Sequence, residues 1–271
     1  MLPEGFILRM QSLLGEEYAA FSASFDRPLC TGLRLNPLKT GFTGDLSRFS
    51  LSPVPWCPTG YVYDAASRPG LSSYHAAGLY YLQEPSAMAP AELLDPQPGE
   101  RVLDLCAAPG GKSTQLAGKL QGRGLLVCNE INAKRAKILA GNIERLGIAN
   151  ALVLNEHPKK LETRFEGYFD KILVDAPCSG EGMFRKEEAA VTDWSEETVL
   201  MCARRHPHVR GKDAAPGRAA GVFHMYLLAC GKRVRDLRFF VEKSRFFCGK
   251  PPRAGLFPRP SGLGGAPRAG A

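Results

Sequence analysis

Hydrophobic residues between positions 101 and 178 recur in two alternating patterns. Short apolar runs at 101–106, 125–130, 151–155 and 169–178 each read as a strand. Amphipathic stretches of helical period lie between the first three runs, at 111–120 and 131–147. The longer stretch has its apolar residues at Ile131, Ala136, Leu139, Ile143 and Leu146. Strands that alternate with helices predict an α/β fold with a doubly wound parallel sheet.

The first 95 residues follow a different pattern, which predicts a small α+β domain. Residues 1–22 read as one helix. Its apolar face consists of Phe6, Met10, Leu13, Leu14 and Tyr18. A short strand is predicted at 32–39, where Pro37 ends it, and a stretch rich in Pro, Ser and Gly follows. Residues 75–94 are predicted to be helical, with an interruption at Pro85 that starts a second helix.

The pattern changes again after residue 205. The last 21 residues contain 10 Pro or Gly and show neither a strand nor a helix period. Residues 201–271 hold 15 Lys and Arg against 3 Asp and Glu, whereas residues 1–200 hold 20 against 24. The net charge of +8 therefore comes from this tail, which weakens the case for a basic nucleic-acid-binding face. We predict domains at 1–95 and 96–205, followed by a basic, largely disordered tail at 206–271.

Composition excludes several other classes. No apolar run is long enough to span a membrane, and the N-terminus has no secretory pattern, so we expect a cytoplasmic protein without membrane contact. The eight cysteines form no C-x-x-C pair, so neither a metal site nor a redox pair is indicated. In that compartment the cysteines are expected to be reduced thiols.

Candidate chemistry begins where the strand at 101–106 ends, in the segment LDLCAAPGGKSTQLA. Small residues leave room for backbone N–H groups to approach a ligand at the start of a helix. These residues are Ala107, Ala108, Gly110 and Gly111, and Lys112 follows them. The spacing matches neither the phosphate-binding G-x-x-x-x-G-K-[ST] loop nor G-x-G-x-x-G.

Two acids end neighbouring predicted strands. Glu130 lies 19 residues beyond Gly111, where a carboxylate accepts hydrogen bonds from both ribose hydroxyls of an adenosine. That placement suits NAD and S-adenosylmethionine equally, and a solvated glutamate is the simpler alternative. The strand at 169–178 ends in DAPCSG, which places Asp175 and the thiol of Cys178 three residues apart on a turn stiffened by proline. Ligands bind at this edge of such sheets.

These motifs resemble the Nop/Sun family of S-adenosylmethionine-dependent RNA 5-methylcytosine methyltransferases, in its ribosomal RNA branch. The resemblance covers about residues 1–205 and rests on YHAAGLYYLQEPSAM, LDLCAAPGGKS, Asn-Glu at 129–130 and DAPCSGEGMFRK. It implies a Rossmann-like class I methyltransferase sheet after an N-terminal RNA-guiding domain. It also implies S-adenosylmethionine as cofactor, ribosomal RNA as partner, no metal, and a monomer.

The resemblance also implies residue roles. The methyl donor would be lined by Cys106, Ala107, Ala108, Pro109, Gly110, Gly111 and Lys112. Glu130 would hold the ribose, Arg135 would neighbour the site and Glu156 would sit by the adenine, although the family more often has Asp there. Asp175 would bond the target pyrimidine, and Cys178 would assist release of the product. Arg34 and Asn36 would contact RNA, with a surface arginine and a turn asparagine as the alternatives.

The family's attacking cysteine lies in a later strand, in a stretch like LVYSTCTF, and no such string is present. Reading the codons of residues 212–232 one base later permits RMLRPGGRLVYSTCTFSPVEN. The cysteine triplet there is TGT whatever codon is used, because Met225 is ATG and Tyr226 begins with TA. We hypothesise that the chain leaves its ancestral frame near His206. The last strands of the sheet would then be missing, and the strand at 169–178 would have an unpaired edge.

Three functions remain open. The chain is an RNA cytosine-5 methyltransferase by descent that is inactive as written, or an active enzyme that uses Cys178. In the third, it is a non-catalytic remnant that binds S-adenosylmethionine or RNA. The substrate of the enzyme is expected to be 16S ribosomal RNA, with tRNA as the alternative.

Overall fold

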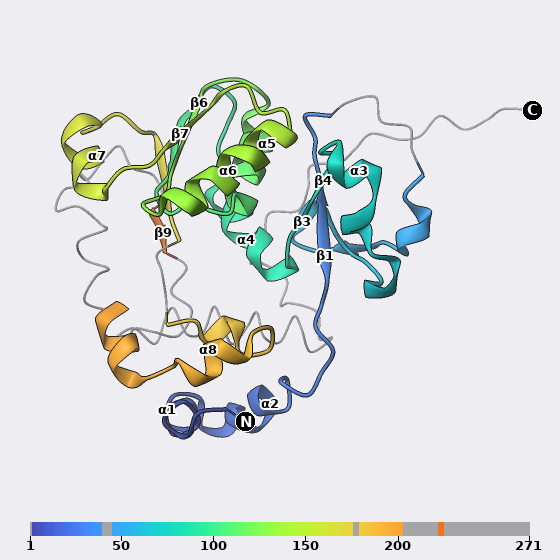
Figure 1. Cartoon of the computed structure of the whole chain (residues 1–271), viewed down its shortest axis with the longest axis vertical. Helices are drawn as coiled ribbons and strands as arrows, with labels where there is room; N and C mark the ends of the chain where they lie inside the picture. Colours follow the sequence, from blue (N-terminus) through green and yellow to red (C-terminus); the bar gives the residue numbers. More distant parts are fainter. Residues whose placement is uncertain (1, 40–44, 176–178, 203–221, 225–271) are drawn as a thin grey trace, which may run out of the picture.

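Two β-sheets, one antiparallel and one parallel, organise the computed structural model of this chain (Figure 1). The structure describes residues 2–39, 45–175, 179–202 and 222–224. Within this part, no helix is long and apolar enough to cross a membrane.

The N-terminal sheet has the strand order β2-β3-β1-β4, and all its pairs are antiparallel. The elements up to its last strand are α1 (Glu4–Leu14), α2 (Tyr18–Ser22), β1 (Gly32–Leu35), β2 (Ser52–Val54), β3 (Cys57–Val62), α3 (Ser73–Ala76) and β4 (Tyr80–Leu82), with short 3-10 turns at Gly15–Glu17, Ser47–Phe49, Ala65–Ser67 and Pro69–Leu71. The sequence predicted β1 correctly but missed β2 and β3. Both lie in the Pro-rich stretch, where the pairing of β3 with β1 and of β2 with β3 compensates for weak local preference.

Two helix predictions in this region need correction. The single helix expected at 1–22 is divided at Gly15, whose φ of 50° ends α1. The helix expected at 75–94 is wrong for Tyr80–Leu82, which forms β4 and pairs with β1. Tyr and Leu at these positions gain more from cross-strand packing against β1 than from a helical turn. The second helix does begin at Pro85, as predicted.

The second sheet is fully parallel, with the order β7-β6-β5-β8-β9. Its elements are α4 (Pro85–Leu94), β5 (Arg101–Asp104), α5 (Gly111–Leu120), β6 (Leu125–Asn129), α6 (Ala133–Arg145), β7 (Ala151–Leu154), α7 (Pro158–Arg164), β8 (Lys171–Val174), a 3-10 turn at Glu181–Met183, α8 (Glu188–Thr192) and β9 (Val222–His224). Residues 196–202 are also helical. The predicted Rossmann-like α/β architecture is therefore confirmed.

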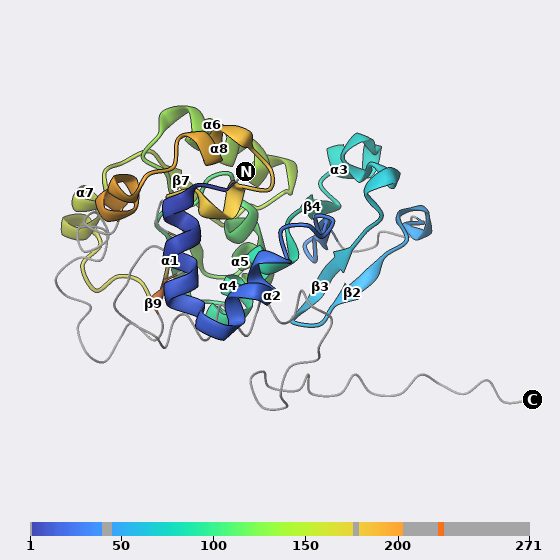
Figure 2. The same ribbon diagram turned by 90° about the horizontal axis from the view of Figure 1, so that it is seen from below.

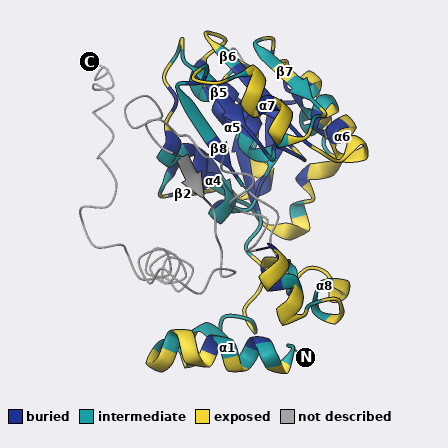
Figure 3. Cartoon of the chain, turned by 90° about the vertical axis from the view of Figure 1, so that its left-hand side faces the viewer, coloured by how far each residue is buried: buried dark blue, intermediate teal, exposed yellow. Residues whose placement is uncertain are grey.

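Apolar side chains cover both faces of this sheet. Figure 3 marks most of β5 and β6 as buried. On one face α4, α5 and α6 contribute Ala91, Leu116 and Leu139 to a core around Val102 and Leu126. On the other face Leu161 of α7 packs with Phe169 against the strands. The helix α6 keeps its predicted apolar face, except that Ile131 precedes the helix and is exposed.

The predicted unpaired edge beside β8 is wrong. Strand β9 pairs with β8 in parallel, with Val222 opposite Ile172 and His224 opposite Val174. A short extended segment satisfies the backbone groups that β8 would otherwise expose. The rest of the predicted disordered tail lies outside the described residues.

The N-terminal helix packs against the segment that follows β8. Phe6 and Met10 of α1 are buried with Phe184, and Trp194 lies against the same cluster. Figures 1 and 2 show α1 beside α8. The helix α1 and the segment from Phe184 to Trp194 thus form a small apolar layer of their own.

Candidate functional site

Hydrogen bonds to neighbouring elements hold the loop between β5 and α5 in place. Ala107 N–H donates to Asn129 O (2.8 Å), and Arg135 Nη2 donates to Ala108 O (2.7 Å). Asn142 of α6 donates to Pro109 O (2.8 Å). The carbonyls at the centre of the loop are therefore bonded to α6, while the first N–H groups of α5 have no partner within their helix.

Gly110 could not be replaced without strain. Its φ is 111°, and a Cβ there would lie 3.1 Å from the side chain of Leu139. Ala107 and Ala108 are buried, and Gly111 begins α5. The small residues identified in the sequence thus form a tight turn at a helix N-terminus.

Glu130 lies directly beside this loop. It is 3% exposed, and its carboxylate accepts from the N–H of Asn132 (2.9 Å) and lies 3.5 Å from Arg135 Nη1. Asn132 in turn caps α6 with its side chain, which fixes the turn after β6. Glu130 and Arg135, singled out separately in the sequence, therefore form one pair.

Asp175 meets the loop from β8. Its carboxylate forms an ion pair of 2.6 Å with Lys112 Nζ, and both side chains are partly exposed. The strand β8 is thereby joined to the first turn of α5 at the carboxyl edge of the sheet. Cys178, predicted beside Asp175, lies outside the described residues.

A third carboxylate, Asp104, was not identified from the sequence. It ends β5 and is 1% exposed, with Oδ2 accepting from Ser113 Oγ (2.7 Å) and Oδ1 without a partner in the described structure. Burial raises the pKa of this carboxyl to about 7, against a smaller opposing effect of the Ser113 hydrogen bond. The sequence signal for Asp104 was its position in LDLC, two residues before the loop that begins at Cys106.

The raised pKa of Asp104 gives a pH-dependent stability. The folded protein holds this proton more tightly than the unfolded chain, so the stabilisation is complete below about pH 3.8 and is lost as the pH rises through about 7. Asp104→Asn is therefore expected to unfold less readily than the unaltered chain at pH 8, by up to about 4 kcal/mol, with a smaller gain at pH 5. Urea unfolding without ligand measures both values, and an equal gain at the two pH values would contradict the assignment.

Cys106, at the start of the loop, is partly buried. Burial raises the pKa of its thiol to about 12, with further contributions from Asp104, Asp175 and Glu130. Burial also raises the pKa of Cys57, to about 11, and that of Cys128. These cysteines are thiols rather than thiolates near neutral pH, which makes them poor nucleophiles.

Glu156 stands apart from this group. Its backbone N–H and C=O are both bonded to the side chain of Asn129, which fixes the turn after β7. Its carboxylate is partly exposed and pairs with Lys160 of α7 at 2.8 Å. The backbone of Glu156 is thus held near the end of β6, while its side chain faces α7. Among the described residues, no cluster of His, Cys, Asp or Glu is arranged to hold a metal ion.

Arg34 and Asn36 are buried at 2% and 6% exposure. Arg34 donates to Gln83, Gly111 and Thr114, and Asn36 donates to the carbonyls of Gly78 and Leu146. The RNA contact expected of these two residues is not available in this conformation, because their polar atoms bond to the protein itself. The place of both residues in the apolar segment GLRLN was the sequence signal for their buried position.

Comparison with known families covers most of the chain. The model of 16S rRNA methyltransferase RsmB/F matches residues 91–218, and the model of the N-terminal domain of 16S rRNA methyltransferase RsmF matches residues 2–85. The chain belongs to the RsmB/F methyltransferase family. The resemblance drawn from the sequence motifs is thereby confirmed, and the interval between the two matches, residues 86–90, lies within α4.

Individual RsmB/F relatives agree with this assignment. Ribosomal RNA small subunit methyltransferase F of Vibrio campbellii is 39% identical over 214 residues, which are 74% of this chain and 45% of the relative. The protein of the same name from Enterobacter sp. is 39% identical over 215 residues, with the same coverage. The chain thus spans about half the length of the curated relatives it matches.

Solved structures show the same architecture. A methyltransferase homolog protein from Pyrococcus horikoshii is 30% identical, with a TM-score of 0.59, over 74% of this chain and 67% of that one. NSun6 from Pyrococcus horikoshii, solved with SFG, is 18% identical with a TM-score of 0.65, over 77% of this chain and 78% of that one. The second likeness concerns the fold alone.

Proposed function

We propose that this chain binds S-adenosylmethionine at the loop 106–112 and that its fold serves methylation of cytosine C5 in 16S ribosomal RNA. The observation that carries the proposal is the placement of Asp104, Glu130 and Asp175 at the carboxyl ends of the neighbouring strands β5, β6 and β8, beside a turn of small residues. S-adenosylmethionine, when bound, supplies a methyl group on a positively charged sulfur, together with an ammonium group and a ribose diol. A site rich in carboxylates suits each of these three groups.

Each acid has a distinct part in this proposal. Glu130, buried at the end of β6, accepts from the ribose hydroxyls, and Arg135 keeps its carboxylate oriented. Asp104 has the unpartnered oxygen Oδ1, which gains a partner when a cationic ligand binds. The residues Gly110 and Gly111 let the ligand approach the backbone N–H groups of α5.

The RNA chemistry assigns Asp175 to the target base. A thiolate that adds to C6 of cytosine turns C5 into a carbon nucleophile, which takes the methyl group. By family resemblance, Asp175, which Lys112 holds at the edge of the sheet, would hydrogen-bond the target pyrimidine and so stabilise this adduct. A base then removes the C5 proton and the thiolate is eliminated. By family resemblance, Cys178 assists this release.

The attacking thiolate is the missing part of the proposal. The chain has no cysteine in the family's later motif, and burial keeps Cys57, Cys106 and Cys128 protonated. We therefore propose that the chain as written binds the cofactor without completing methyl transfer. Methyl transfer through Cys178, or to tRNA instead of ribosomal RNA, is the competing outcome of an activity assay.

Calorimetric titration of the full chain with S-adenosylhomocysteine, beside NAD and ATP, tests the binding part of this proposal. Glu130 suits the ribose of all three ligands, but carboxylates beside the loop disfavour the phosphates of NAD and ATP. One site for S-adenosylhomocysteine with micromolar Kd is expected, and at least about tenfold weaker binding of the two phosphate-bearing ligands. Preference for NAD would count against the proposal.

A further inference from the structure

The proposed cofactor loop leads directly into helix α5. The N-terminal domain contacts this helix along its length. At the first turn Arg34 of β1 donates to the Gly111 carbonyl (3.1 Å) and to Thr114 Oγ1 (2.7 Å). At the far end Pro37 packs so closely on Gly118 that a Cβ there would lie 2.9 Å from its ring. The helix thus lies directly against the strand β1 and the turn that follows it.

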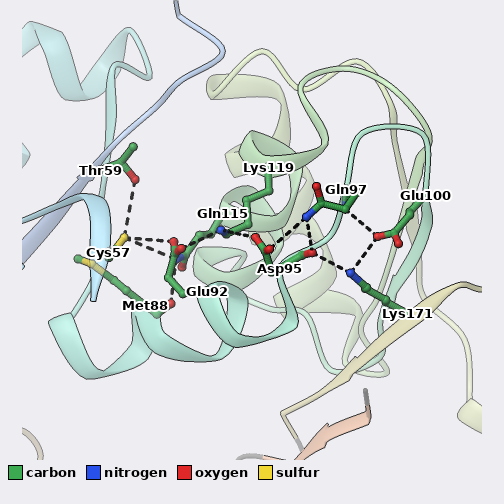
Figure 4. Close-up of polar contacts among 10 residues, drawn as sticks. All are labelled: Cys57, Thr59, Met88, Glu92, Asp95, Gln97, Glu100, Gln115, Lys119 and Lys171. Carbon is green, nitrogen blue, oxygen red and sulfur yellow. Dashed lines mark hydrogen bonds and ion pairs between the residues drawn. The ribbon is translucent and has the colours of Figure 1, made fainter. Parts of the chain in front are cut away.

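The middle of α5 is bonded to α4, and through Cys57 of β3 to the N-terminal sheet, by a polar network (Figure 4). Gln115 donates to Glu92 Oε1 and to the Met88 carbonyl, each at 2.8 Å. The thiol of Cys57, on β3, donates to the same Glu92 oxygen at 3.4 Å. Lys119 adds an ion pair with Glu92 at 2.7 Å. Both the loop end and the centre of α5 are therefore fixed by buried polar contacts.

Arg34 is an unusual residue to place there. It is 2% exposed, and it forms no ion pair with a carboxylate within the part of the chain that the structure describes. Burial lowers its pKa to about 10, so it still carries its charge at neutral pH. A buried cation without a direct counter-charge is costly, and a positive charge at a helix N-terminus opposes the helix dipole. The buried Arg34 side chain is therefore not explained by a contribution to the stability of the fold.

Geometry offers a better reason. The planar guanidinium bonds three acceptors at once, with Nε directed at Gln83 (2.8 Å) and Nη2 at Gly111 and Thr114. Gly111 is the residue at which the loop becomes helix, so the contact fixes the direction in which the first N–H groups of α5 point. Lysine could not span the same acceptors.

We propose that Arg34 is a positioning residue for the cofactor loop, through which the N-terminal domain sets the affinity for S-adenosylmethionine. This inference rests on the proposed cofactor site. Because coupling between two parts of a protein is reciprocal, a bound cofactor strengthens the docking of the N-terminal domain on α5 in turn.

Asn36 provides a matched control on the same strand segment. It bonds the carbonyls of Gly78 and Leu146, each at 2.9 Å, and so joins the N-terminal domain to the end of α6 rather than to the loop. Arg34→Ala and Asn36→Ala both remove buried hydrogen bonds across this contact. Only the first is expected to change cofactor affinity.

Calorimetry with S-adenosylhomocysteine on the full chain tests the inference. Arg34→Ala is expected to raise Kd at least about tenfold. Thr114→Val removes an acceptor of Arg34 and also the hydrogen bond from the Thr114 hydroxyl to the Gly111 carbonyl (3.2 Å), and it is expected to raise Kd about threefold. Arg34→Lys is expected to stay within about twofold of Arg34→Ala, because charge alone does not restore the geometry. Asn36→Ala should leave Kd within about twofold of the unaltered chain, even where it lowers the melting temperature.

The outcomes separate the inference from the proposed function. Unchanged Kd in Arg34→Ala and Thr114→Val, with normal binding by the unaltered chain, overturns the inference alone. An equal loss in Asn36→Ala also overturns it, since a general structural effect then explains the data. If Arg34→Ala fails to fold, Arg34→Lys decides, because it changes the geometry of the guanidinium contacts and leaves the bond from Thr114 to Gly111 in place. Absence of binding by the unaltered chain defeats the proposed function, and the inference with it.

Discussion

Replacing residues 212–232 by RMLRPGGRLVYSTCTFSPVEN, which includes Met225→Cys, is expected to raise methyl transfer to a 16S ribosomal RNA fragment by about 10³-fold or more. This segment is the one-base-shifted reading of the same codons. It would supply the attacking cysteine of the family's later motif, which the chain lacks. Loss of a catalytic nucleophile commonly costs at least this factor.

Strand β9 would place the new cysteine at the same edge of the sheet as Asp175. Strand β9 ends at His224, opposite Val174 of β8, and Asp175 follows Val174 in the chain. The carboxyl ends of parallel strands lie at one edge of a sheet, so a cysteine that follows β9 would share an edge with Asp175. The replacement puts Tyr-Ser-Thr in place of Val-Phe-His at 222–224, and Tyr and Thr also favour extended backbone.

Transfer of labelled methyl groups from S-adenosylmethionine measures this result. The matched control is the same replacement with serine in place of the new cysteine, which should stay at the level of the unaltered chain. Activity of the unaltered chain that disappears on Cys178→Ser would show instead that Cys178 is the nucleophile. Equal activity of the cysteine and serine replacements would contradict the hypothesis of a lost frame.

Glu130→Ala is expected to raise the Kd for S-adenosylmethionine by about 100-fold or more. A hydrogen bond to a charged acceptor contributes about 1.5–3 kcal/mol, and Glu130 is placed to accept two from the ribose. Glu130→Gln, which keeps one acceptor and the side-chain shape, should lose about tenfold.

Glu156→Ala serves as the comparison for Glu130→Ala. Its carboxylate is partly exposed and bonded to Lys160, so we expect at most about a threefold change in Kd. Calorimetry on the three variants gives the order directly. A Kd in Glu130→Ala within threefold of the unaltered chain would remove Glu130 from the site.

The parallel sheet and its loop could be predicted from the sequence because their signals are local. Alternating apolar runs mark β5, β6, β7 and β8, and the small residues before Lys112 mark the turn that Gly110 makes with its positive φ. Glu130 and Asp175 could be found for the same reason, since both directly follow a strand.

The features that the sequence did not reveal depend on distant contacts. Tyr80–Leu82 is a strand only because β1 lies beside it, 45 residues or more earlier in the chain. The sequence predicted a surface position for Arg34, whereas the fold buries it and its guanidinium donates to the Gly111 carbonyl. Asp104 reads as an ordinary strand residue, and its significance comes from burial and an unpartnered oxygen. Each of these is a tertiary effect that overrides local preference.

Calorimetric titration of the unaltered chain with S-adenosylmethionine tests the central claim most directly, with circular dichroism of the same sample to establish that it is folded. One binding site per chain with a micromolar Kd is predicted, together with an affinity that falls in Glu130→Ala. A folded sample that releases or absorbs no heat with S-adenosylmethionine or S-adenosylhomocysteine at several temperatures would contradict the claim.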